Sequence, residues 1–251
     1  MVQARTPAPQ PDNQPDTRPD ICVVGAGPGG FAAALSAVAE GASVVLVEKG
    51  SPGGANLMAG TIPSKALLAA ADIYESLRSG VALGVSGAPL QVSLAKVREH
   101  IVAVTEAAGR SVSPERLAAE GVTLLAGAAR FVDPNTIMAG ETAIRPRRVV
   151  LAVGSRPAAP DLPGLETVET VSVADVLDLG RKPAHLLILG GGPYVLELAQ
   201  GLTRLGIDTS VIAEGPALPD EDPELAALVV DRLRAEGVRI RTGVKIASVA
   251  R

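Results

Sequence analysis

Residues 20–48 read DICVVGAGPGGFAAALSAVAEGASVVLVE, and this stretch decides the fold of the chain. A short apolar run, DICVV, leads into the glycines of GAGPGG. A stretch of small residues with helical spacing follows, and a second apolar run, SVVLVE, ends the segment. This pattern is typical of a strand, a tight turn, a helix and a second strand. We therefore predict a βαβ unit at this place.

The glycines of this unit predict a nucleotide site. Gly25, Gly27 and Gly30 form the pattern G-x-G-x-x-G between the predicted strand and the predicted helix. Backbone N–H groups at such a turn can approach a pyrophosphate, and the helix dipole favours its charge. Glu48 ends the next strand about 20 residues later, where a carboxylate can accept hydrogen bonds from a ribose hydroxyl. Glycine turns also occur for structural reasons, but this combination predicts a dinucleotide site, and the alternative is a decayed one.

A second stretch, AHLLILGGGPYVLELAQGLTRLGIDTSVIAE at residues 184–214, repeats the βαβ pattern. Its glycines are Gly190, Gly191 and Gly192, and Val195 replaces the third small residue of the motif. The sequence therefore predicts an α/β fold with two Rossmann-like units and parallel sheets, of which the second unit is incomplete.

The second unit also lacks the acidic residue of the first. Ala213 stands at the position that matches Glu48, and Glu214 follows it on the opposite side of the strand. This unit is interpreted either as a working second dinucleotide site or as a βαβ unit kept for packing alone.

The same signals predict the remaining elements. The predicted helices are Pro63 to about Arg78, a longer region from about Ser93 to Ala119, and EDPELAALVVDRLRAEG; the predicted strands are VTLLAG, ARFVD, TIMAG, RVVLAVG, VRIRTG and KIASVA. The first 19 residues are rich in proline and poor in large apolar residues, so we expect a disordered tail. The predicted domains are a tail at 1–19, a first nucleotide-binding domain at 20–158, a linker at 159–182 and a second nucleotide-binding domain at 183–251.

The composition argues against several classes of protein. With a net charge of −4, two tyrosines, two phenylalanines and no tryptophan, we expect no nucleic-acid binding. The single cysteine, Cys22, allows no intrachain disulfide. His100 and His185 show no metal-ligand spacing, so we predict no metal site and interpret both as structural residues. No apolar run is long enough to span a bilayer and the N-terminal residues lack a signal-peptide core, so we expect a cytoplasmic protein.

Four motifs follow one another along the chain in a characteristic order. They are GAGPGG with Glu48, GGANLMAGTIPSKALLAAADIYE at 53–75, AVGSRP at 152–157 and GGGPYVLELAQGLTRLG at 190–206. In this order they resemble the class I pyridine nucleotide-disulfide oxidoreductases, which include lipoamide dehydrogenase, glutathione reductase, mercuric reductase and soluble transhydrogenase. The resemblance implies FAD on the first unit, NAD(P)H on the second and hydride transfer through the flavin.

The resemblance also implies roles for single residues. Lys65 of the P-S-K sequence would reach the flavin near N5 with Glu197 as its partner, and these two are the predicted catalytic residues. A cation held there by a carboxylate stabilises the negative charge of reduced flavin. Without the motif, both would be interpreted as solvated helix charges. The predicted cofactor-binding residues are Gly25, Gly27, Pro28, Gly29, Gly30, Glu48, Lys49, Gly53, Gly54, Ser64, Lys65, Ala129, Gly154, Ser155, Gly190, Gly192, Glu197 and Glu214.

The chain departs from the family at its redox disulfide. The two cysteine positions of the family's C-x-x-x-x-C sequence are Asn56 and Thr61 here. Neither side chain can form a disulfide, so disulfide reduction by the family's mechanism is chemically excluded. Cys22 lies in the first predicted strand and is interpreted as a small buried core residue.

Two functional hypotheses stay open. One is an FAD-dependent enzyme that passes electrons from NAD(P)H to another nicotinamide, a quinone or a small oxidant. The other is a binding module that holds FAD or an adenine nucleotide without turnover, or that pairs with a complementary chain or a second copy. The 251 residues lack the family's later segments, so we expect a natural short gene, a split subunit or a cut chain. Glu214 would repel the 2′-phosphate of NADPH by on the order of 1 kcal/mol, so we expect a weak preference for NADH.

Overall fold

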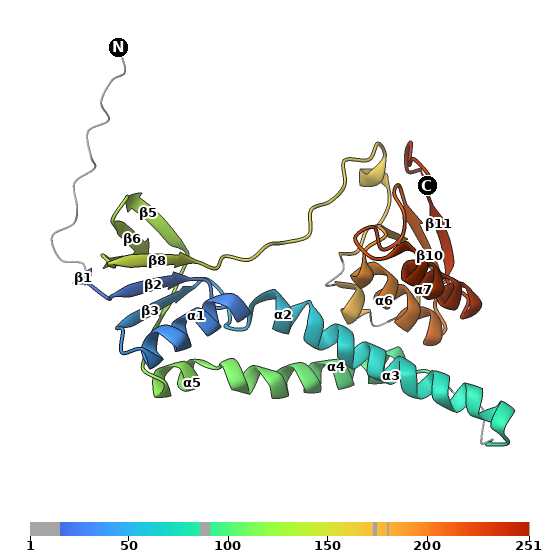
Figure 1. The fold of residues 1–251 in the computed structure, drawn as a ribbon, viewed down its shortest axis with the longest axis horizontal. Helices are drawn as coiled ribbons and strands as arrows, with labels where there is room; N and C mark the ends of the chain where they lie inside the picture. The colour runs from blue at the N-terminus through green and yellow to red at the C-terminus, as the bar shows by residue number, and fades with distance from the viewer. Residues whose placement is uncertain (1–15, 86–90, 173–174, 180, 251) are drawn as a thin grey trace, which may run out of the picture. The chain divides into compact units, whose positions relative to one another are not determined.

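The computed structural model describes residues 16–85, 91–172, 175–179 and 181–250. Close contacts divide the chain into two compact units, one of residues 1–56 and 109–155 and one of residues 57–108 and 156–251 (Figure 1). Both units contain parallel strands joined through helices, which confirms the predicted α/β class.

The first unit contains a four-stranded parallel sheet in the order β4-β3-β2-β8. Its strands are β2 (Ile21–Val24), β3 (Val44–Glu48), β4 (Val122–Ala126) and β8 (Arg148–Leu151). Helices α1 (Pro28–Ala39) and α5 (Pro114–Ala119) supply buried residues to a core with one face of this sheet. Val23, Leu46 and Leu117 lie in that core. The first predicted βαβ unit is therefore present as β2, α1 and β3.

A smaller sheet packs on the other face, in the order β1-β7-β6-β5. Its strands are β1 (Asp16–Thr17), β5 (Ala129–Asp133), β6 (Thr136–Ala139) and β7 (Thr142–Ile144). Cys22, Val45 and Val47 form a core with Ile137 and Ile144 of this sheet. Because side chains alternate along a strand, β3 buries residues on both of its faces.

The structure corrects the predicted tail at its end. Asp16 and Thr17 form a short strand that pairs with Ala143 and Ile144 of β7, and the Arg145 N–H donates to the Thr17 carbonyl at 2.8 Å. The backbone bonds of β7 order these two residues, which the composition of the tail does not reveal. Residues 1–15 of the predicted tail lie outside the described residues.

The second unit contains a three-stranded parallel sheet in the order β11-β10-β9. Its strands are β9 (His185–Leu189), β10 (Asp208–Ala213) and β11 (Arg239–Thr242). The helices are α3 (Thr61–Gly80), α4 (Leu94–Gly109), α6 (Pro193–Arg204) and α7 (Pro223–Ala235), with 3-10 turns η1 (Val81–Leu83), η3 (Leu165–Thr167) and η4 (Asp175–Asp178). The short helix α2 (Gly54–Met58) crosses the boundary between the two units. The second predicted βαβ unit is present as β9, α6 and β10.

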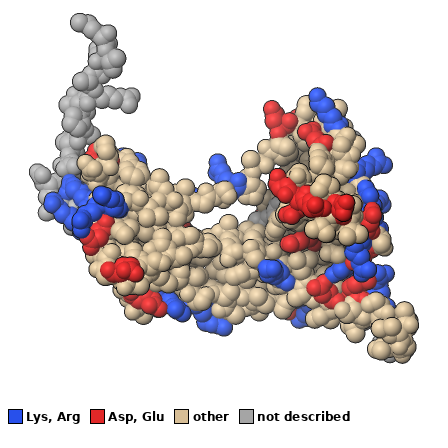
Figure 2. Space-filling view, viewed as in Figure 1, with Lys and Arg blue, Asp and Glu red and all other residues tan. Residues whose placement is uncertain are grey.

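Helix α3 packs against α6 in this unit. Leu67 of α3 and Leu198 and Leu202 of α6 belong to one buried core. A Cβ atom added at Gly201 would lie 2.9 Å from a methyl carbon of Leu67 and of Leu68, so a glycine permits the close approach of the two helices. Arg204 then joins three elements, because it pairs with Asp72 of α3 and with Glu236 after α7. Figure 2 shows acidic and basic side chains intermixed over the second unit.

The helical region predicted from about Ser93 to Ala119 is present as two helices with a 3-10 turn between them. Helix α4 ends at Gly109, a 3-10 turn η2 (Arg110–Val112) follows, and α5 begins at Pro114. The Ser113 side chain accepts a hydrogen bond from the Arg116 N–H at 3.2 Å. Pro114 has no N–H with which to continue α4, and Ser113 caps a new helix. The interruption between α4 and α5 is therefore caused by these two neighbouring residues.

The strand predicted at KIASVA is wrong. Residues 244–250 form no strand, and the Val249 N–H instead donates to the Pro163 carbonyl at 2.8 Å. Gly164 adopts φ +85°, and a Cβ atom there would lie 2.0 Å from the Val249 carbonyl oxygen. A strand needs a ladder of hydrogen bonds to a neighbour, and this segment meets a turn instead.

The compact units do not follow the order of the chain. Residues 57–108 pack with residues 156–251, and η4, inside the predicted linker, buries Val176 and Leu177 in the core around α3 and α6. The predicted domain boundaries at 158 and 182 divide the chain by the nucleotide that each part would bind, and they stay a prediction.

Candidate nucleotide-binding site

The first glycine turn lies between β2 and α1. Gly25 adopts φ +101°, and a Cβ atom there would lie 2.3 Å from the Ala152 carbonyl oxygen after β8. A Cβ atom at Gly30 would lie 1.8 Å from the Gly25 carbonyl oxygen. Both contacts are with backbone, which cannot swing away as a side chain could. Glycine at these two positions therefore lets α1 begin directly against the carboxyl ends of β2 and β8.

The N-terminus of α1 lacks a capping side chain. Gly27 is its N-cap, Pro28 stands in the first turn, and the first intrahelical bond runs from the Phe31 N–H to the Gly27 carbonyl at 2.8 Å. A Cβ atom at Gly29 would meet nothing within 4 Å. The N–H groups of Gly29 and Gly30 therefore precede the first intrahelical bond, where an anion is stabilised by the donors and by the helix dipole.

A second glycine pair lies against this turn. The Gly53 N–H donates to the Ala26 carbonyl at 2.8 Å. Gly54 adopts φ +58°, and a Cβ atom there would lie 2.8 Å from the Gly27 Cα atom. A Cβ atom at Gly27 would stand 4.0 Å from the Gly54 Cα atom. The two segments thus form a cradle of bare backbone, which fits a pyrophosphate and which added Cβ atoms would fill.

Glu48 is fixed at the end of β3 beside the same turn. Its Oε2 accepts a hydrogen bond from the Ala26 N–H at 2.7 Å, and its Oε1 accepts one from the Gly50 N–H at 2.8 Å. Each carboxylate oxygen keeps a further acceptor site. The carboxylate can therefore receive ribose hydroxyls without moving.

Four further residues predicted for this nucleotide lie in the first unit, whereas Ser64 and Lys65 lie in the second. Ala129 begins β5, Gly154 and Ser155 follow β8, and Lys49 is exposed directly after Glu48. Gly154 adopts φ +67° with open space beside it. Most of these residues therefore lie at the carboxyl edge of a parallel sheet, at the ends of β2, β3 and β8. Folds of this kind bind their ligands at that edge.

The second glycine turn is built differently. Gly190 adopts φ +124°, and its N–H donates to the Ile212 carbonyl at 2.9 Å. A Cβ atom at Gly190 would lie 3.3 Å from Cγ2 of Val195, so the valine replaces the close contact that Gly30 makes in the first unit. Gly192 is the uncapped N-cap of α6 with open space beside it. This turn offers backbone donors, as the first one does.

The loop after β10 folds back onto the second turn. The Leu218 N–H donates to the Gly191 carbonyl at 2.7 Å, and Leu218 adopts φ +52°. Ala213 is buried and Glu214 is exposed. The position that Glu48 holds in the first unit is therefore filled by a small core residue, Ala213, in the second. The carboxylate of the next residue, Glu214, is exposed to solvent.

Lys65 and Glu197 stand on helices that pack together, α3 and α6. Both residues are exposed, and within the part of the chain that the structure describes no ion pair joins them. Their helices meet through Leu67, Leu198 and Leu202. The structure brings the two helices into one core but leaves the two charges apart.

The sequence did not single out Tyr194 as a site residue. Its hydroxyl donates to the Ala59 carbonyl at 3.3 Å, just before α3 begins. Burial raises the pKa of Tyr194. Ser64 is buried and donates to the Thr61 carbonyl at 3.2 Å. The signal in the sequence was weak, because a tyrosine in the first turn of a helix is common.

The single thiol is buried in the core of the first unit. Cys22 is 0% exposed, and burial raises its pKa to about 11. Asn56 is half-buried and Thr61 is exposed at the two positions where the family has cysteines. Among the described residues, no cluster of histidine, cysteine and acidic side chains could hold a metal ion. None of the described helices has the length and apolar character needed to cross a bilayer.

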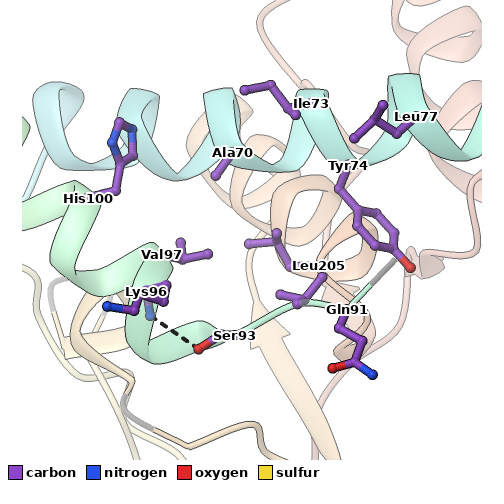
Figure 3. Close-up of a pocket in the computed structure, with 11 residues that line it drawn as sticks. Ala70, Ile73, Tyr74, Leu77, Gln91, Ser93, Lys96, Val97, His100 and Leu205 are labelled. Atoms are coloured by element: carbon purple, nitrogen blue, oxygen red, sulfur yellow. Dashed lines mark hydrogen bonds between the residues drawn. The ribbon is translucent and has the colours of Figure 1, made fainter. Parts of the chain in front are cut away.

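An open groove of about 420 Å³ lies elsewhere in the second unit (Figure 3). Side chains of α3 and α4 form most of it, and the Lys96 ammonium at its edge pairs with Glu99 at 2.8 Å. The lining residues are Ala70, Ile73, Tyr74, Leu77, Gln91, Val92, Ser93, Lys96, Val97, His100 and Leu205. None of the predicted site residues lines this groove.

Comparisons with known proteins identify the family of the chain. The family model described as pyridine nucleotide-disulphide oxidoreductase matches residues 19–251. The chain is 33% identical over 226 residues to a dihydrolipoyl dehydrogenase of Geobacillus stearothermophilus, covering 88% of this chain and 47% of that protein. It is 33% identical over 242 residues to a mercuric reductase of Streptomyces lividans, covering 92% and 50%. The chain thus spans about half the length of these relatives.

A solved structure shares the fold. The HOCl-induced flavoprotein disulfide reductase RclA of Escherichia coli, in its Cu(II) complex, superposes with a TM-score of 0.78 at 22% identity. The match covers 93% of this chain and 51% of that protein. At this level of identity the similarity concerns the fold alone.

Proposed function

The chain belongs to the pyridine nucleotide-disulphide oxidoreductase family, and we propose that it acts as an FAD-dependent oxidoreductase that passes electrons from NAD(P)H to an acceptor without a redox disulfide. The family is enzymatic and uses FAD and NAD(P)H. When bound, FAD would supply the chemistry of accepting hydride from the nicotinamide and transferring electrons to an acceptor. The residues of this chain would bind and orient the two cofactors and would stabilise the negative charge of the reduced flavin.

The observation that carries the proposal is the glycine cradle with Glu48. Gly27 and Gly54 approach closely enough that a Cβ atom on Gly54 would lie 2.8 Å from the Gly27 Cα atom. Glu48 is held by two backbone donors at 2.7 and 2.8 Å. We assign the pyrophosphate of FAD to the cradle, the ribose to Glu48, and FAD as a whole to residues 20–158.

We assign NAD(P)H to residues 183–251, with the N-terminus of α6 at its pyrophosphate. Gly192 is the uncapped N-cap at this terminus and has open space beside it, while the N–H of Gly190 is already bonded to the Ile212 carbonyl. Lys65 would stabilise negative charge near N5 of the flavin, and Glu197 would hold that lysine, as the family resemblance implies. Both side chains are exposed.

The acceptor follows from what stands at the cysteine positions. Asn56 and Thr61 cannot form a disulfide, and the one thiol, at Cys22, is buried. The acceptor must therefore take electrons from the flavin directly. A quinone, a second nicotinamide or a small oxidant has that chemistry.

The test is FAD binding by a pair of glycine variants. Gly27 has extended backbone at φ −72°, and a Cβ atom there meets nothing closer than 4.0 Å, so Gly27→Ala should fold. Its methyl group would nevertheless stand in the cradle, and we expect the FAD affinity to fall at least tenfold. Gly80→Ala is the control, because Gly80 ends α3 with its nearest contact at 3.5 Å.

The measurement is equilibrium titration of the purified proteins with FAD, followed by the visible spectrum. Equal affinity in the wild type and Gly27→Ala would contradict the assignment of the cradle. Bound flavin that bleaches with anaerobic NADH supports the oxidoreductase. Colourless protein that takes up no added FAD would support a binding module or a subunit that needs a second chain.

A further inference from the structure

Two helices and one short segment meet just before Lys65. Tyr194 is the second residue of α6, and its hydroxyl donates to the Ala59 carbonyl at 3.3 Å across 135 residues of sequence. The Ser64 hydroxyl, on the other side of Thr61, donates to the Thr61 carbonyl at 3.2 Å. These contacts fall on both sides of Thr61 and end one residue before Lys65.

The start of α3 has few hydrogen bonds from side chains of other elements. Gly60 is the N-cap of α3, with φ −118° and ψ −128°, and no side chain caps the helix there. Among the described residues, Tyr194 is the one side chain from another element that hydrogen-bonds to residues 59–63. Tyr194 therefore supplies the side-chain hydrogen bond that joins this segment to α6.

In the family that this chain resembles, a disulfide between the positions of Asn56 and Thr61 closes this segment. Here that covalent link is chemically impossible. The Ala59 carbonyl lies between the two positions, so the hydrogen bond from Tyr194 attaches the segment at its middle. Burial raises the pKa of the Tyr194 hydroxyl, so this group keeps the proton that it donates.

We propose that Tyr194 is a positioning residue, which holds residues 59–64 against α6 and so gives Lys65 a single orientation in a chain without the family's disulfide. The proposal rests on the function proposed above, since the orientation of Lys65 matters only if a flavin is bound. The packing of α3 on α6 through Leu67, Leu202 and Gly201 does not involve residue 194, so its variants should fold.

The first test uses the protein without FAD. Tyr194→Phe keeps the ring and removes the hydroxyl, and we expect the backbone amides of residues 57–65 to exchange with deuterium about 2- to 10-fold faster. Tyr74→Phe is the matched control, because Tyr74 lines the groove of Figure 3 and makes no hydrogen bond to this segment. Unchanged exchange in Tyr194→Phe would overturn the proposal.

The second test distinguishes a positioning role of Tyr194, which acts through Lys65, from a purely structural role. With FAD bound, Tyr194→Phe should shift the flavin midpoint potential to more negative values, because a mobile Lys65 stabilises reduced flavin less. In a Lys65→Met background the same change should have no further effect, since Tyr194 acts through Lys65. An unchanged potential, or an equal shift in both backgrounds, would overturn the proposal. Failure of the wild-type protein to bind FAD would instead refute the proposed function, and the exchange experiment would still decide whether Tyr194 holds the segment.

Discussion

The Oε2 atom of Glu48 accepts a hydrogen bond from the backbone N–H of Ala26 at 2.7 Å. This contact joins the end of β3 to the middle of the first glycine turn. The same carboxylate holds the Gly50 N–H through Oε1 at 2.8 Å. One side chain therefore shapes the turn and presents acceptor sites at the place where a ribose would lie, which lowers the entropy lost on binding.

Glu48→Gln should weaken both functions of this side chain. A carboxamide has one acceptor oxygen, so either the Ala26 N–H or the Gly50 N–H would face an NH₂ group. We expect the free energy of unfolding to fall by about 1–2 kcal/mol and the FAD affinity to fall about tenfold. Glu141→Gln, at an exposed turn of the same unit, is the control. Unchanged FAD binding in Glu48→Gln would exclude Glu48 as the ribose ligand.

Gly30→Ala should strongly destabilise the first unit. The added Cβ atom would lie 1.8 Å from the Gly25 carbonyl oxygen and 3.2 Å from the Ala152 Cβ atom. Relief requires α1 to move away from β2, at a cost of about 3 kcal/mol or more, and the variant could fail to fold. Urea denaturation measures the effect, and Gly80→Ala serves again as control. A loss below about 1 kcal/mol would show that the turn relaxes easily.

The parts of the fold that the sequence predicted are those specified by neighbouring residues. The apolar run before Gly25, the helical spacing after Gly30 and the run ending at Glu48 each indicate one element, and their order gives β2, α1 and β3. The glycines and Glu48 are recognisable for the same reason, since a turn, a helix start and a strand end bring them together without help from distant residues.

The parts that the sequence missed depend on distant partners. Strand β1 exists because Asp16 and Thr17 pair with β7, more than a hundred residues away. The predicted strand at 245–250 has suitable side chains but meets a turn at Pro163. The bond from Tyr194 to Ala59 spans 135 residues. Local propensity carries no information about such contacts.

Glu236 should make the stability of the second unit depend on acid pH. Arg204 and Arg232 donate to its carboxylate at 2.7 and 2.6 Å, its side chain is 5% exposed, and these hydrogen bonds lower its pKa from 4.5 to about 2. Because the folded pKa lies below the unfolded value, the stabilisation is complete above about pH 5 and is lost as the pH falls through 4.5 toward 2.

The measurement is urea denaturation of Glu236→Gln and wild type from pH 7 to pH 2.5. We expect the variant to be about 2 kcal/mol less stable at pH 7 and the difference to shrink at low pH. Glu99→Gln removes an exposed pair with Lys96 and should change stability by less than about 0.5 kcal/mol. A constant difference across the pH range would show that Glu236 acts through packing and not through its charge.

Cys22 should take no part in redox chemistry. It is 0% exposed in the core between the two sheets of the first unit, and its pKa is raised to about 11 by burial. An aromatic disulfide reagent should label no thiol in the native protein and one in denaturant. With FAD bound, wild type and Cys22→Ala should be reduced equally by NADH, without the long-wavelength absorption of a thiolate beside flavin. Reduction of lipoamide or glutathione disulfide by the pure protein would contradict the absence of dithiol chemistry.

Glu214 should bias the second unit weakly toward NADH. It is exposed, it follows β10 directly, and the loop behind it is held to the glycine turn by the 2.7 Å bond from the Leu218 N–H to the Gly191 carbonyl. A carboxylate near the 2′-phosphate of NADPH repels it by on the order of 1 kcal/mol, which corresponds to a few-fold preference. Glu214→Arg should reverse that preference, while Glu224→Arg, an exposed charge reversal on α7, should leave it unchanged. The measurement is the anaerobic rate of flavin reduction against the concentration of each nicotinamide. It gives the preference for NADH or NADPH in each protein. Faster reduction by NADPH in the wild type would refute the preference, because the exposed carboxylate would then have no influence on the bound phosphate.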